Sequence, residues 1–276
     1  MALGGLRASL LAGAALLIAG PAFAADLSGG SLKDAPAAVA DAFAFTGYVQ
    51  ITNDYIFRGI SQNRRDVALQ GGLDFSYGMF YAGTFLSTVN FDNPEWSPKL
   101  NASEEVDLYA GIKPKVGAVT FDFGFITYNY LGKDVNHLAG IYDPYYLELK
   151  AGASITVLKD LALSGTLYYS PDYGGEMGPA ITVEGTASKP IAKVGGVDWA
   201  ASGTVGAVNF SDASAHNIAN NDYVYGNLGV TGTIGMLSLD LRWWDTNLSA
   251  NKAPCGDGTA TLACGNAFAA TAKFAF

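Results

Sequence analysis

Alternation of apolar and polar residues with a period of two runs through most of this chain. Successive side chains of a β-strand point to opposite faces, so the pattern predicts strands with one apolar and one polar face. About twelve segments between residues 43 and 276 show it, each a weak signal alone. In the first of them, Phe45, Val49 and Ile51 share one face. No helical periodicity of useful length interrupts the series, and this repetition predicts an all-β fold.

The composition favours a membrane barrel over a soluble sandwich, although alternation alone fits both. Half of the residues are apolar and only 15% are charged, whereas soluble proteins carry about 25% charged residues. No apolar run long enough for a spanning helix follows residue 24. A transmembrane barrel distributes its apolar residues one in two along many strands, which accounts for both observations.

The connections between the predicted strands alternate between short and long. Short turns are expected at 77–79, 114–118, 157–160 and 235, with a somewhat longer one at 189–196, and the others are rich in Asn, Asp, Gly and Pro. Bacterial barrels combine short periplasmic turns with longer outer loops. The sequence therefore predicts a transmembrane antiparallel up-and-down β-barrel over residues 43–276. It would lie in lipid of the bacterial outer membrane, with both termini in the periplasm.

Both ends of the chain fit export to that membrane. Residues 1–24 read as a signal peptide with one charge, an apolar core and an Ala-Phe-Ala cleavage site, and 25–42 as a periplasmic N-terminal segment. The last predicted strand ends on Phe276. Such an ending resembles outer-membrane barrels, whose assembly machinery recognises it, so that machinery is an expected partner. Aromatic residues near strand ends predict interfacial girdles, among them Tyr55, Tyr77, Phe80, Tyr128, Tyr130, Tyr169, Tyr223, Trp243 and Trp244.

The two cysteines, Cys255 and Cys264, are separated by eight residues in the last predicted outer loop. In an exported protein such a pair is most simply a disulfide, which would stabilise this loop by at most about 2–3 kcal/mol. A metal site is not expected, because no histidine lies near and two thiolates do not complete a tetrahedral set.

Residues 54–62, Asp-Tyr-Ile-Phe-Arg-Gly-Ile-Ser-Gln, follow the first predicted strand. With the blocks at 70–74, 81–85, 105–111 and 127–130, this motif resembles a family of proteobacterial outer-membrane proteins labelled TorF-family porins. The resemblance covers most of the mature chain. It implies an outer-membrane barrel with a porin role, and it supplies no solute.

If the apolar faces meet lipid, the polar faces line the interior. The candidate lining acids are Asp54, Asp74, Glu105, Asp107, Asp122, Glu148, Glu184, Asp198 and Asp240, and the candidate bases are Arg58, Lys113, Lys150, Arg242 and Lys273. The surplus of about four negative charges predicts a weak cation preference. Twelve strands lie between the eight that leave room only for side chains and the sixteen or more that enclose an aqueous channel, so any pore should be narrow.

Arg58 stands out among these residues, since it lies four residues after Asp54 where the first strand is expected to leave the membrane. It is either a constriction or loop-anchoring charge pair or a paired structural residue at a strand end.

Several functions are disfavoured. A net charge of −9 argues against nucleic-acid partners. The two histidines, His137 and His216, lie in predicted outer loops, and there is no Gly-x-Ser-x-Gly motif, so neither an enzyme nor a cofactor is expected. Passive diffusion of small solutes remains, beside a closed structural or adhesive barrel acting through its loops. The sequence does not separate these two, and it leaves the oligomeric state open.

Overall fold

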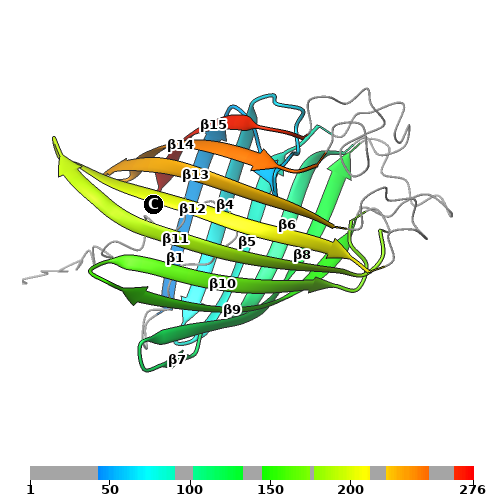
Figure 1. The fold of residues 1–276 in the computed structure, drawn as a ribbon, viewed down its shortest axis with the longest axis horizontal. Coiled ribbons are helices and arrows are strands. Elements are labelled where there is room, and N and C mark those ends of the chain that lie inside the picture. The colour runs from blue at the N-terminus through cyan, green and yellow to red at the C-terminus, as the bar shows by residue number, and fades with distance from the viewer. Residues whose placement is uncertain (1–42, 91–101, 133–144, 175–176, 212–221, 249–263) are drawn as a thin grey trace, which may run out of the picture.

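The chain forms a closed antiparallel β-barrel (Figure 1). The computed structural model describes residues 43–90, 102–132, 145–174, 177–211, 222–248 and 264–276. Within these ranges the structure contains strands and turns and no helix. No helix in the described part of the chain is long and apolar enough to cross a membrane.

Twelve long strands make the ring among the described residues, as the sequence predicted. They are β1 (Phe43–Thr52), β4 (Ala68–Tyr77), β5 (Phe80–Thr88), β6 (Ala102–Ile112), β8 (Val119–Gly132), β9 (Tyr146–Val157), β10 (Leu161–Ser170), β11 (Ala180–Val194), β12 (Val197–Phe210), β13 (Asp222–Ile234), β14 (Leu237–Thr246) and β15 (Ala267–Ala275). Each pairs with its neighbours in sequence, and β1 pairs with β15. Gly47 and Phe276 exchange two backbone hydrogen bonds of 2.8 Å at that seam, which closes the ring.

The predicted alternation matches the two faces of the wall. In β1, Val49 and Ile51 are each 51% exposed on the outside, whereas Gln50 and Thr52 are each 3% exposed on the inside. The same contrast recurs in β14 between Leu241 and its polar neighbours. The exterior is therefore an apolar belt and the interior is polar, which is the distribution of a barrel surrounded by lipid.

One end of the barrel, which we call the turn end, carries tight turns at 78–79, 158–160, 195–196 and 235–236. At this end, β7 (Lys115–Val116) pairs with β8 within the 113–118 connection. The prediction of a turn over 189–196 is wrong for its first six residues, because β11 continues to Val194 through a register shift between Pro190 and Ala192. The β11–β12 hairpin consequently projects past its neighbours (Figure 1).

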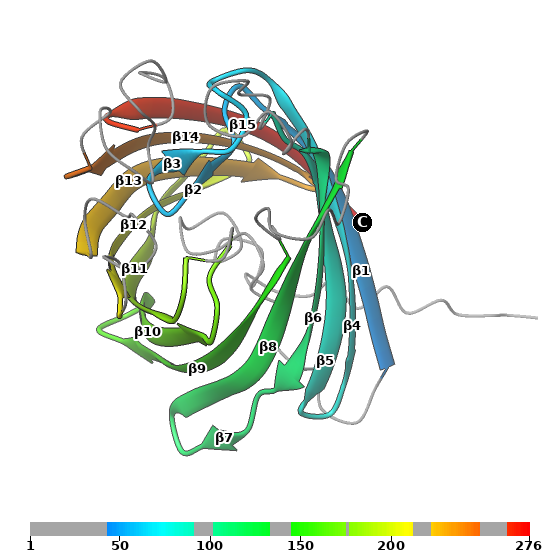
Figure 2. The same ribbon diagram turned by 90° about the vertical axis from the view of Figure 1, so that its right-hand side faces the viewer.

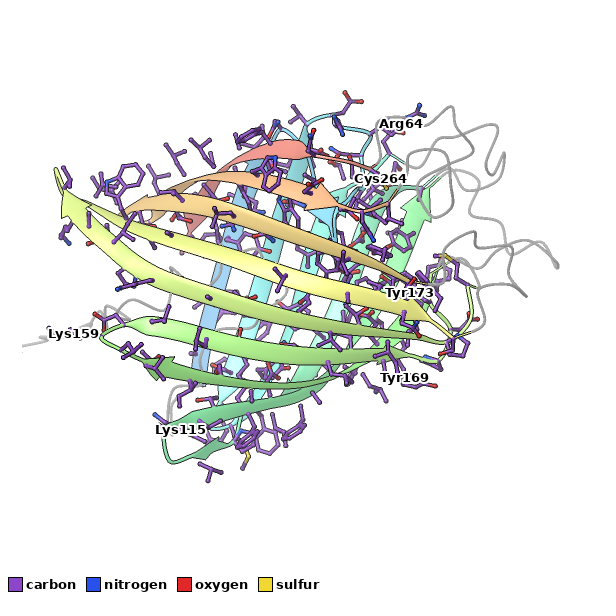
Figure 3. All side chains as sticks on the ribbon, viewed as in Figure 1. Arg64, Lys115, Lys159, Tyr169, Tyr173 and Cys264 are labelled. Carbon is purple, nitrogen blue, oxygen red and sulfur yellow. The ribbon has the colours of Figure 1, made fainter. Side chains whose placement is uncertain are left out.

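The opposite end, which we call the loop end, receives the longer connections. Most of them fall in the ranges 91–101, 133–144, 212–221 and 249–263, outside the described residues. The β1–β4 connection is described throughout, and it contains two short strands, β2 (Ile56–Phe57) and β3 (Ile60–Ser61). Figure 3 shows Tyr173 and Cys264 toward the loop end, and Lys115 and Lys159 toward the turn end.

Candidate functional site

The β2–β3 hairpin lies inside the ring of long strands (Figure 2). Its two-residue turn, Arg58-Gly59, holds φ angles of 48° and 79°, the left-handed pair that a tight hairpin requires. This conformation costs a residue with a side chain about 1–3 kcal/mol, so contacts around Arg58 must maintain it. At the hairpin base, the Gln62 N–H donates to the Tyr55 carbonyl over 2.7 Å. The Ser61 hydroxyl donates to the Asp54 carboxylate over 2.6 Å, and burial raises the pKa of Asp54.

The hairpin crosses the interior from the β1–β4 side to the far wall. A Cβ atom added at Gly59 would lie 2.9 Å from Cβ of Tyr225 on β13 and 3.1 Å from Cβ of Thr246 on β14. Only glycine fits this contact. The ring of Phe57 lies 5.8 Å, centroid to centroid, from that of Tyr128 on β8. The hairpin thus contacts strands in widely separated parts of the ring.

Arg58 joins the hairpin tip to the wall through a bidentate ion pair. Its two terminal nitrogens donate to the Glu148 carboxylate on β9 over 2.6 and 2.9 Å, and its Nε lies 4.0 Å from the carboxylate of Glu184 on β11. Both members of the Arg58–Glu148 pair are almost completely buried. Burial alone would lower the pKa of Arg58, but the Glu148 charge leaves this pKa raised well above its ordinary value. The guanidinium is therefore charged in the folded protein.

Tyrosines complete the surroundings of this ion pair. The Tyr128 hydroxyl donates to Glu148 over 2.8 Å, and the Tyr225 hydroxyl donates to Glu184. The guanidinium carbon lies 4.7 Å from the ring centroid of Tyr168 and 4.8 Å from that of Phe57. These separations fall within the range of cation–π attraction. Acceptors and aromatic faces thus contact the same cation.

A second polar cluster on the wall involves Asp122 of β8. Nζ of Lys150 lies 2.9 Å from the Asp122 carboxylate and Nζ of Lys113 lies 3.9 Å from it. The Tyr81 hydroxyl donates to the same carboxylate over 2.7 Å. Across the barrel, Arg242 pairs with Asp240 on β14 at 2.9 Å.

Three further predicted lining acids are also buried in the interior. Glu105 accepts a hydrogen bond of 3.0 Å from the Tyr55 hydroxyl, and Asp74 accepts one of 2.7 Å from the Tyr109 hydroxyl. Asp107 is 0% exposed. Asp198 differs from all of these, because it lies beside the 195–196 turn with its side chain 62% exposed and paired to Lys193 at 2.9 Å. It therefore lies at the rim of the turn end, away from the hairpin.

Packing inside the barrel changes along the strands. Toward the loop end, Tyr168 of β10 and Thr182 of β11 are each 1% exposed. Toward the turn end, Ser164, Thr166 and Thr186 face the same interior and are only half-buried. Along β10 and β11 the interior is consequently filled at the level of the hairpin and lined by small, partly exposed side chains closer to the turn end. Other strands keep buried polar side chains at that level, among them Thr204 and Asp240.

The prediction of a Tyr-rich interfacial girdle is correct only in part. Tyr77, Phe80, Tyr169 and Trp243 are exposed on the exterior, but Tyr55, Tyr128, Tyr130, Tyr223 and Trp244 are buried. The sequence contained a signal for the correct placement on β8, where Tyr128 and Tyr130 share the even-numbered face with Asp122. Arg58, for which the sequence left open a constriction or loop-anchoring charge pair and a paired structural residue, is paired with Glu148, and Asp54 accepts a hydrogen bond from Ser61.

Cys264 is buried and disulfide-bonded. Cys255, its predicted partner and the chain's other cysteine, lies outside the described residues. Arg65 donates to the carbonyl of Cys264 over 3.2 Å, which ties the β3–β4 segment to the start of β15. Within the described ranges, no three His, Cys, Asp or Glu side chains gather in a way that would hold a metal ion.

Comparison with known protein families shows which family this chain belongs to. A model of the Gcw_chp family, described as a bacterial protein of unknown function, matches residues 36–273. The chain belongs to the Gcw_chp family. A search of curated proteins found no match.

Solved structures show the same fold. The KdgM porin superimposes with a TM-score of 0.50 at 7% identity, covering 84% of this chain and 99% of that chain. The KdgM porin in complex with disordered oligogalacturonate gives a TM-score of 0.52 at 7% identity, with the same coverage. At this identity the likeness establishes the barrel fold and nothing finer.

Proposed function

We propose that this protein is a narrow outer-membrane porin whose lumen is closed at the loop end by the β2–β3 hairpin and conducts when the hairpin moves. In this proposal the turn end faces the periplasm. Residues 1–24 are removed as a signal peptide, residues 25–42 form a periplasmic segment, and the assembly machinery inserts the barrel through the strand ending at Phe276. The TorF-family resemblance supports a porin role.

The observation that carries the proposal is the way the hairpin is attached. It is not a member of the ring, so its displacement breaks none of the backbone hydrogen bonds that join the strands of the barrel wall. Its tip is joined to the wall by an ion pair and aromatic contacts, which water and permeant ions can replace. Below the hairpin, the small side chains of β10 and β11 line the interior.

The proposed solutes are small and neutral, zwitterionic or cationic. Without Asp198, which lies at the rim, the predicted lining acids still outnumber the lining bases by eight to five, and the resulting negative potential favours cations. Oligogalacturonate, the ligand in one of the similar structures, is a polyanion, and the same potential disfavours a ligand of that charge here.

The test is single-channel recording of the refolded chain, residues 25–276, in a planar bilayer with a salt gradient. We expect discrete openings whose reversal potential favours cations. The double variant Glu105→Gln, Asp107→Asn should shift this potential toward zero because two lumen charges are removed. An unchanged reversal potential would contradict the assignment of these acids to the lumen.

The second candidate is a permanently closed barrel that acts through its outer loops. The burial of the interior around Arg58 favours it. A bilayer that stays silent, while the gel mobility of the protein still shifts on boiling, would support this candidate over the porin.

A further inference from the structure

The barrel wall alone provides most of the groups that surround Arg58. We call these wall residues the guanidinium cage; they are Tyr128, Glu148, Tyr168, Tyr173, Glu184 and Tyr225. Five of them lie on the ring strands β8, β9, β10, β11 and β13, and Tyr173 lies in the β10–β11 connection, so none of the six belongs to the hairpin. Of the aromatic groups that contact Arg58, Phe57 belongs to the hairpin itself.

The geometry of the cage suits a planar cation. Glu148 accepts two parallel hydrogen bonds from the two terminal nitrogens of Arg58, an arrangement that a guanidinium provides and an ammonium does not. The ring centroids of Tyr168 and Tyr173 lie 4.7 and 6.0 Å from the guanidinium carbon of Arg58. At these distances an aromatic ring attracts a delocalised cation. Nε of Arg58 makes no hydrogen bond, although Glu184 lies 4.0 Å away. A free guanidinium, which is not constrained by a side chain, could engage both carboxylates.

The charge balance favours the same occupant. Glu148 is 1% exposed and Glu184 is 7% exposed, so removal of Arg58 would leave two carboxylates in a poorly hydrated site. Buried charge without a counterion is strongly unfavourable. Displacement of the hairpin is therefore easiest when another cation of matching shape takes the place of Arg58.

We propose that the guanidinium cage is a binding site for solutes that carry a guanidinium group, and that Arg58 is its tethered occupant. Such a solute competes with Arg58 for Glu148 and, by taking its place, releases the hairpin from the wall. Binding rests on the cage alone. The passage of the bound solute through the barrel rests on the proposed porin function.

The attachment of Arg58 to the hairpin explains how the cage can be occupied and still discriminate between free cations. A side chain on a short hairpin has an effective concentration in the millimolar range or above, so weakly bound ions do not displace it. A variant without the guanidinium should uncover the site. Arg58→Ala is therefore the variant in which a free ligand binds without competition.

The test measures binding without conductance. Refolded Arg58→Ala protein in detergent is heated with increasing ethylguanidinium or, separately, ethylammonium, and unfolding is followed by gel mobility. Ethylguanidinium should raise the unfolding midpoint at concentrations at least about tenfold lower than ethylammonium. The wild type should respond less, because Arg58 occupies the cage. The double variant Arg58→Ala, Glu148→Gln should lose the preference for ethylguanidinium.

Equal responses of Arg58→Ala to the two cations, or no response, would overturn the proposal. So would a preference that survives Glu148→Gln. If Arg58→Ala does not fold, Arg58→Lys replaces it, because lysine keeps the charge but not the planar fork. Ethylguanidinium should still raise the unfolding midpoint of Arg58→Lys more than ethylammonium does. Equal midpoints with the two cations would overturn the proposal.

A second measurement separates this site from the channel. Free arginine added to the wild type in a planar bilayer should increase the frequency of openings, and lysine at the same concentration should not. Selective binding in the melting assay with a silent bilayer would reject the porin and retain the cage. Openings that arginine and lysine affect equally, together with no selective binding, would reject the cage and retain the porin.

Discussion

The same two strands behave differently in the two halves of the barrel. Near the loop end, β10 and β11 present Tyr168 and Glu184, which are buried against the hairpin. Near the turn end they present Ser164 and Thr186, which are half-buried. The backbone ladder is continuous through both halves, with Thr166 opposite Glu184 and Ser164 opposite Thr186.

The difference therefore arises from side-chain size and from one inserted segment. The ring sets the diameter, whereas the hairpin and the tyrosines around it determine how much of the interior is filled. Substitutions at the hairpin and its contacts should disturb a packed, charged network, and substitutions at the half-buried positions of β10 and β11 nearer the turn end should disturb little. The following variants test this contrast.

The largest effect is expected from Arg58→Ala. It leaves Glu148 buried without its cation, which typically costs about 3–5 kcal/mol. Thr166→Ala, on the half-buried part of β10, is the matched control and should change the free energy of unfolding by less than about 1 kcal/mol. Urea titration in lipid micelles, followed by gel mobility, measures both. Equal losses in the two variants would contradict the contrast.

A smaller loss is expected from Tyr128→Phe. This substitution removes one hydroxyl that donates to Glu148, and a hydrogen bond to a charged group contributes about 1.5–3 kcal/mol. The exterior residue Tyr169 is 39% exposed, so Tyr169→Phe serves as the control and should be close to neutral in the same titration. A neutral Tyr128→Phe would show that the network does not stabilise the loop half.

Gly206→Ala should have the smallest of the three effects in the loop half. A Cβ atom at residue 206 would lie 2.3 Å from Cζ of Tyr225, so the ring must move and weaken its hydrogen bond to Glu184. Such overpacking costs about 1–3 kcal/mol, and the lower part of that range is expected because a ring can shift. At Gly185, an added Cβ meets nothing within 4 Å. Gly185→Ala is therefore the control and should not destabilise the protein.

The barrel itself could be predicted from the sequence, because the alternation on each strand reports directly which side chains face lipid. The same parity identified Glu148 and Glu184 as interior residues. The same parity places Tyr128 inside the barrel. The prediction put Tyr128 in an interfacial girdle instead, because it lies near a strand end. Alternation contains this information since neighbouring residues on a strand experience opposite solvents.

The partner of Arg58 could not be predicted in the same way. Arg58 and Glu148 are 90 residues apart in sequence, and they meet because the β1–β4 connection folds inward across the barrel. The inward path of this connection depends on the left-handed turn at Arg58-Gly59 and on the space beside Tyr225. The turn and the space produce no periodic pattern in the sequence. The motif over residues 54–62 identified the segment but did not indicate that it folds into the barrel.

The most direct test of the central role of the hairpin is its removal. The Gln62 N–H and the Tyr55 carbonyl are hydrogen-bonded at the hairpin base, so residues 55–62 can be replaced by a short Gly-Ser linker without straining the ring. Single-channel conductance of this variant and of the wild type should then be compared, with heat-dependent gel mobility confirming that both barrels fold. We predict rare, brief openings for the wild type and a persistent, larger conductance for the variant. The same conductance in both proteins would show that the hairpin does not close the barrel.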